Sequence, residues 1–125
     1  MISESDIQKM NSPEQLREAA YDHNWDDGLS VPMAIASHAK CDLGVALELF
    51  WLGAAISWLT GEITANDYNT EWCDFSKYMV DTIAEGRYRP GSCGFETPLT
   101  QTQIYKYRKQ GIPDIYLLSV EAVND

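Results

Sequence analysis

Residues 43–59, LGVALELFWLGAAISWL, decide how this chain of 125 residues folds. Thirteen of these seventeen residues are apolar, and the exceptions are Gly44, Glu48, Gly53 and Ser57. A helix over this stretch is apolar on nearly every side, so it needs neighbours on most sides. The stretch is shorter than the roughly 20 apolar residues that a bilayer span requires, and it contains a carboxylate. We therefore predict a buried central helix and no membrane partner.

Capping and stop signals predict shorter helices around this central one. Asp42 is the expected N-cap of the central helix. Ser12 and Thr100 are each followed three residues later by a glutamine, a spacing that predicts capping boxes. The expected helices cover residues 2–10, 13–23, 32–38, 69–85 and 100–110, whereas residues 115–123 fit either a last helix or a strand.

The fold class predicted from these elements is all-α. A chain of this length buries roughly two-thirds of its unfolded surface, which is enough for one core. No internal repeat, low-complexity tract or linker divides the sequence. We predict one domain, residues 1–125, built as a compact bundle of five to seven helices around residues 43–59.

The net charge is −10, because nineteen Asp and Glu oppose nine Lys and Arg. Residues 1–75 contain thirteen acidic and three basic residues, whereas residues 76–125 contain six of each, so the whole net charge lies in the first three-fifths of the chain. Such a field attracts cationic partners and disfavours nucleic acid. Solubility alone explains an acidic surface equally well.

The cysteines and the N-terminus predict a cytoplasmic protein. The three cysteines are odd in number and form no CxxC pair, which fits a reducing compartment and predicts no zinc framework. The first residues lack the basic and apolar regions of a signal peptide.

The clearest candidate binding surface is a set of five carboxylates, which we call the acidic stripe. Glu14, Glu18 and Asp22 recur every four residues along the predicted helix 13–23, so they share one face, and Asp26 and Asp27 follow directly. A solvated helix face explains this pattern. A docking surface for a basic protein explains it as well.

Candidates for catalysis or metal binding are sparse. His23 with Asp26 and Asp27, together with His38 and Asp42, is the one set that has metal-ligand chemistry, although aspartates at turns and helix starts also act as caps.

Other chemical signals are weaker still. Glu48 is either a buried acid or a residue facing solvent, and Cys93 lies in a loop with no histidine near it in sequence. No phosphate-binding glycine motif is present, so we expect no cofactor. Tyr105 and Tyr107 alternate with basic residues, and we expect this basic helix to pack near the acidic half.

Two motifs resemble those of a known family. They are Asn24-Trp25-Asp26-Asp27-Gly28 and, after Pro32, Cys41-Asp42-Leu43-Gly44-x-Ala46-Leu47, followed by Phe50-Trp51. Over about residues 16–60 the chain resembles a family of small bacterial proteins known as domain of unknown function 4274. The resemblance implies bacterial origin and a compact, mostly helical domain. It implies no activity and carries over no catalytic residues, so we interpret both motifs as turn and cap devices.

The leading functional hypothesis is a binding protein. Small acidic cytosolic bacterial proteins of this kind look like the immunity proteins of toxin systems, an analogy of type. The hypothesis is that the acidic stripe covers the basic surface of a cognate toxin, which needs no catalytic residue. The alternatives are a small metal-binding or hydrolytic enzyme that uses His23, His38 and the nearby aspartates, and a regulatory adaptor.

Overall fold

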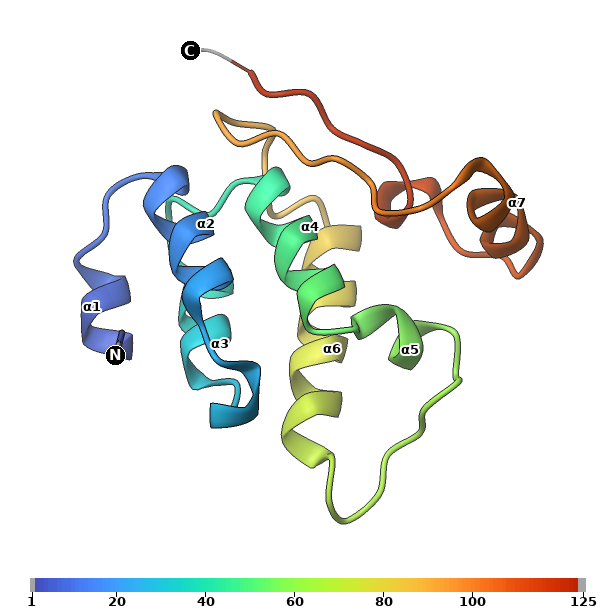
Figure 1. Ribbon diagram of the computed structural model, residues 1–125, viewed down its shortest axis with the longest axis horizontal. Helices are drawn as coiled ribbons and strands as arrows, with labels where there is room; N and C mark the ends of the chain where they lie inside the picture. The colour runs from blue at the N-terminus through green and yellow to red at the C-terminus, as the bar shows by residue number, and fades with distance from the viewer. Residues whose placement is uncertain (1, 124–125) are drawn as a thin grey trace.

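Residues 2–123 are described by the computed structural model, and seven α-helices and two 3₁₀ turns make up their regular structure (Figure 1). In chain order they are α1 Glu4–Gln8, α2 Pro13–Asp22, η1 Trp25–Asp27, α3 Ser30–Ser37, α4 Leu43–Leu52, α5 Ala55–Leu59, α6 Thr70–Ala84, α7 Gln101–Lys109 and η2 Asp114–Tyr116. The described residues form no β-strand, and one isolated bridge joins Phe95 to Val120. The predicted all-α bundle is confirmed.

Helices α4 and α6 form the centre of the bundle (Figure 1). Helix α4 packs against α2, α3, α5 and α6, as expected for a helix that is apolar nearly all round. Leu47, Leu49 and Phe50 of α4 are fully buried, together with Phe75 and Met79 of α6. Helix α7 lies at the opposite end of the long axis from α1 and α2.

The prediction of one continuous helix over 43–59 is wrong at its middle. Helix α4 ends at Leu52, Ala54 adopts a left-handed conformation with φ 57°, and α5 begins at Ala55. Gly53 is needed at the break, because a Cβ there would lie 2.6 Å from a ring carbon of Phe75 and 3.1 Å from one of Trp25. The Trp72 indole N–H donates to the Gly53 carbonyl at 2.7 Å and satisfies a backbone group freed by the break.

The predicted N-cap at Asp42 is confirmed, and it has a second role. One carboxylate oxygen accepts from the Val45 N–H at 3.0 Å, and the other accepts from the Cys93 N–H at 2.9 Å. Gly44 allows this approach, because a Cβ there would lie 2.1 Å from the Cys93 carbonyl oxygen. The loop that contains Cys93 is therefore seated directly on the first turn of α4.

Other helix starts match the signals in part. Thr100 and Gln103 form the predicted capping box at α7. At α2, Ser12 accepts from the Gln15 N–H, but the Gln15 side chain accepts from Asn11 instead of Ser12, so the box is incomplete.

Residues 115–123 form neither of the two predicted elements. The short turn η2 ends at Tyr116, whose buried hydroxyl donates to the Val80 carbonyl at 2.8 Å and holds the turn against α6. Val120 then exchanges both backbone hydrogen bonds with Phe95, and the Val123 N–H donates to the Gly91 carbonyl. The backbone pairing of this C-terminal segment is limited to one isolated bridge, so the segment is not a β-strand.

Candidate functional site

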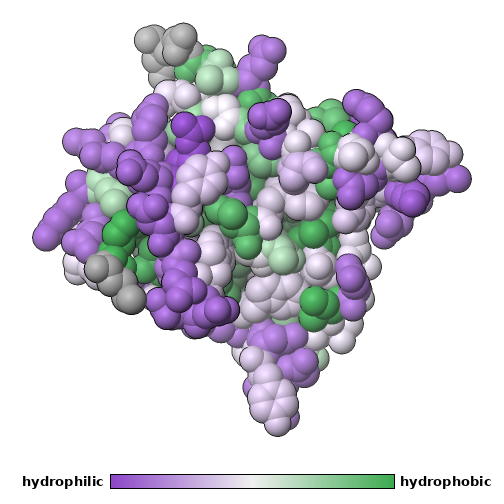
Figure 2. Space-filling model, in the orientation of Figure 1, coloured by the Kyte–Doolittle hydropathy of each residue, from purple (hydrophilic) through white to green (hydrophobic). Residues whose placement is uncertain are grey.

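All five carboxylates of the acidic stripe are exposed. Glu14, Glu18 and Asp22 lie on α2, whose buried residues are Leu16, Ala19 and Ala20. Packing of that apolar face against the bundle leaves the carboxylates in solvent. Figure 2 shows a mostly hydrophilic surface on the side of the molecule where α1 and α2 lie.

In the turn after α2, Asp26 and Asp27 are exposed, whereas the Trp25 side chain packs inward. Asn24 caps η1 by accepting from the Asp26 N–H at 3.1 Å, and Gly28 has φ 102°, which favours glycine. The Trp25 ring packs edge-on against Phe75 with centroids 5.9 Å apart. The hydrophobic contact of Trp25 thus fixes the turn that presents Asp26 and Asp27.

The stripe does not form one continuous site. Asp22 and Asp27 line the same hollow of about 590 Å³, which also includes Glu4 and the start of α3. Asp26 lines a different hollow, beside Trp25 and Trp72. Glu14 lies at the other end of α2, where the Ser92 side chain holds the pKa of its carboxyl below the usual value.

No basic side chain forms an ion pair with the stripe within residues 2–123. The two ion pairs in this part of the chain are Lys77–Asp81 and Arg108–Asp114, and both lie in the electrically balanced second part of the sequence. The negative charge of the stripe is therefore left to act on molecules outside the chain.

The candidate metal ligands are not brought together. The His23 Nε2 lies 2.8 Å from the Gly28 carbonyl oxygen, and the His38 Nδ1 accepts from the Lys40 N–H at 2.9 Å. Asp42 is buried at the start of α4. Across residues 2–123, no three His, Cys, Asp or Glu side chains converge in a way that would hold a metal ion.

A family model described as Domain of unknown function (DUF4274) matches residues 11–84, which is more than half of the chain. The chain belongs to this family. The match extends beyond the residues 16–60 that carry the resemblance in the sequence. No curated protein matches the chain, and no solved structure matches it.

The DUF4274 match runs from the residue before the α2 cap to the end of α6. It contains the whole acidic stripe and both motifs, whereas α7 and the C-terminal segment lie outside it. The interpretation of the motifs as turn and cap devices agrees with the structure, since Asn24 caps η1 and Asp42 caps α4.

The remaining candidate residues of this DUF4274 chain, the cysteines and Glu48, are buried or half-buried. Cys41, Cys73 and Cys93 are free and buried, and burial raises the pKa of the Cys93 thiol to about 11, so this thiol is protonated at neutral pH. Glu48 is half-buried beside Tyr21, and burial together with the Glu48 hydrogen bond raises the pKa of the Tyr21 hydroxyl to about 12.

The basic helix α7 packs on a part of the acidic half that is remote from the stripe. Tyr107 contacts Trp51 edge-on, with centroids 6.4 Å apart, and Lys106 lines a hollow with Glu62. Tyr105 stays exposed beside Lys109.

None of the helices described is both long and apolar enough to cross a bilayer.

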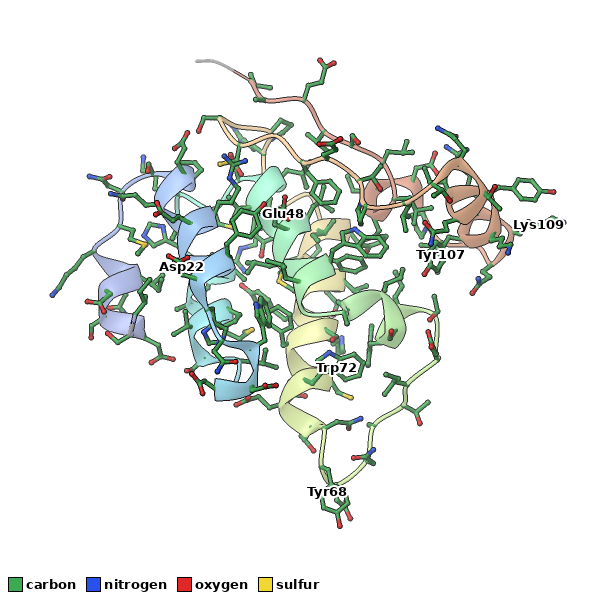
Figure 3. The ribbon with its side chains drawn as sticks, viewed as in Figure 1. Asp22, Glu48, Tyr68, Trp72, Tyr107 and Lys109 are labelled. Carbon is green, nitrogen blue, oxygen red and sulfur yellow. The ribbon has the colours of Figure 1, made fainter. Side chains whose placement is uncertain are left out.

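One exposed residue was missed by the sequence analysis. Tyr68 is 97% exposed in the segment between α5 and α6, and Figure 3 shows its side chain directed away from the helices. The signal in the sequence is Asn66-Asp67-Tyr68-Asn69, in which the aromatic residue stands inside a stretch of turn-forming residues.

Proposed function

We propose that this DUF4274 chain is an immunity protein that binds a bacterial toxin and covers its basic surface. Glu14, Glu18, Asp22, Asp26 and Asp27 are the residues to which we assign the contact. The observation that carries the proposal is the exposure of all five carboxylates without an ion pair to any described Lys or Arg. Protein surfaces of one sign that remain unneutralised favour partners of the opposite sign.

The mechanism requires binding and no chemistry. A field from several carboxylates attracts a basic surface and raises the rate of encounter. Once docked, the bundle excludes substrate from a basic cleft such as that of a nuclease. A cytoplasmic site of action belongs to the same proposal, since three free buried thiols suit a reducing compartment.

We expect the adjacent gene to encode the toxin, and the test is protection of cells against that gene's product. Expression of the chain should restore growth to cells that produce the toxin, and the purified proteins should form a complex whose association slows as salt rises. Removal of the gene from toxin-bearing cells without any loss of growth would contradict the proposal.

A triple substitution tests the face itself. Glu14→Gln, Glu18→Gln and Asp22→Asn together should lower the association rate about ten-fold at low salt and flatten its salt dependence. The matched control is Glu62→Gln, Glu85→Gln and Glu121→Gln, which removes the same charge from exposed positions elsewhere. Equal rates for the two triple variants would show that net charge, and not this face, sets the association.

A further inference from the structure

The segment between α5 and α6 presents an aromatic side chain that the fold does not use. Nearly all of residues 60–69 are exposed, and this segment forms a projecting corner of the molecule (Figures 1 and 2). Tyr68 near its end is 97% exposed, more than any other large hydrophobic residue described. Full exposure of a tyrosine contributes no burial energy to the fold and leaves the ring free to contact a partner.

The backbone that presents Tyr68 is held by asparagine side chains. The Asn66 carboxamide oxygen accepts from the Tyr68 N–H at 2.7 Å and from the Asn69 N–H at 3.1 Å. Asn69 returns the contact by accepting from the Asn66 N–H at 2.8 Å and donates to the Thr64 carbonyl. A side chain on a turn fixed in this way loses little backbone entropy on binding, which is the property of an interface anchor.

A hollow of about 330 Å³ lies beside Tyr68. Its apolar wall includes Trp72 and Leu52, and Leu52 is 39% exposed. Its carboxylates are Asp26 and Glu71, and neither lysine nor arginine is among its described lining residues. One Glu71 carboxylate oxygen accepts from the Leu29 N–H at 2.9 Å, but no described cation pairs with either carboxylate. The hollow thus combines aromatic surface with negative charge, and through Asp26 it joins the acidic stripe.

We propose that Tyr68 and this hollow receive an arginine side chain of the basic protein partner, an inference that rests on the proposed function and deepens it. A guanidinium is planar and stacks on aromatic rings while it pairs with carboxylates, whereas a lysine ammonium is a strongly hydrated point charge. The hollow supplies both kinds of contact within one site. Helix α2 also carries an exposed tyrosine, Tyr21, but this side chain is only 54% exposed and its hydroxyl is hydrogen-bonded to Glu48, so α2 offers a weaker stacking surface than Tyr68.

The experiment titrates the ¹⁵N-labelled full chain with hexa-arginine and, separately, with hexa-lysine, and follows both by NMR. Hexa-arginine should bind about five-fold more tightly than hexa-lysine, and its largest shifts should fall on residues 66–72 and 26. Tyr68→Ala should remove this preference for arginine. Tyr105→Ala is the matched control, since Tyr105 is 58% exposed on α7 and does not line the hollow beside Tyr68, and it should keep the preference.

Each other outcome overturns a specific part of the reasoning. Retention of the arginine preference by Tyr68→Ala, or equal affinity of the wild-type chain for the two peptides, overturns the anchor. Salt-dependent binding confined to α2 would then leave the acidic-face proposal standing. Failure of both peptides to bind overturns the anchor and the acidic face together.

Discussion

Gly44→Ala should destabilise the fold, although the same substitution in an open helix is favourable. An added Cβ at this position meets backbone atoms, namely the Cys93 carbonyl oxygen at 2.1 Å and the Gly94 carbonyl oxygen at 3.0 Å. Overpacking against atoms that cannot rotate away costs about 3 kcal/mol, and the better helix propensity of alanine returns about 1 kcal/mol. The expected net loss in the free energy of unfolding is about 2 kcal/mol.

The expected loss in the free energy of unfolding is the same, about 2 kcal/mol, if the loop moves instead of the helix. Displacement of the loop breaks the Cys93 N–H bond to Asp42 and the Leu43 N–H bond to the Arg89 carbonyl, both 2.9 Å long. Each such bond contributes about 1 kcal/mol net. Urea unfolding measures the loss, and the thermal midpoint should fall by about 8 °C.

Gly86→Ala separates this clash from the effect of backbone conformation. Gly86 has φ 75° and no atom within 4 Å of an added Cβ, so only the left-handed backbone conformation opposes alanine, at about 1 kcal/mol. A Gly44→Ala variant that is as stable as the wild type would refute the seating of the Cys93 loop on α4.

Three further results are expected. Asp42→Ala should cost about 2 kcal/mol in urea unfolding, because the α4 cap and the Cys93 backbone N–H both lose their acceptor. Tyr68→Ala should change the free energy of unfolding by no more than about 0.5 kcal/mol, since the side chain is exposed, and a larger loss would mean that it packs. The folded chain keeps the Cys93 proton up to a pKa of about 11, whereas an unfolded thiol loses it near 9.0, so stability should fall as pH rises through this interval. Cys93→Ala should show a shallower fall in urea titrations, and an unchanged pH slope would contradict the burial of this thiol.

Helix starts could be predicted because caps are local. Asp42 and Thr100 act within a few residues of themselves, and both predicted caps are present. The break at Gly53 could not be predicted in the same way, because the rings that require glycine there, those of Trp25 and Phe75, are remote in sequence. Because residues 43–59 are apolar on nearly every side of a helix, their pattern stays the same whether the helix continues or changes direction at Gly53.

The shared helix face of three stripe residues could be predicted from spacing, but the exposure of the stripe and its division between hollows could not. Spacing of four residues places Glu14, Glu18 and Asp22 on one face of α2. The direction of Asp26 depends on how Trp25 packs, which is a tertiary contact. The role of Asp42 toward Cys93 was hidden for the same reason, because that bond joins residues fifty-one positions apart.

The seating of the Cys93 loop on α4 also sets the size of the smallest autonomous folding unit. The family match ends at residue 84, yet Asp42 inside it needs a donor from Cys93, and the Gly91 carbonyl beyond it receives a bond from Val123. A fragment that ends at residue 84 would lack the Cys93 loop, so the first turn of α4 and its apolar side chains would be exposed to solvent. This chain should therefore require residues beyond 84 to complete its bundle.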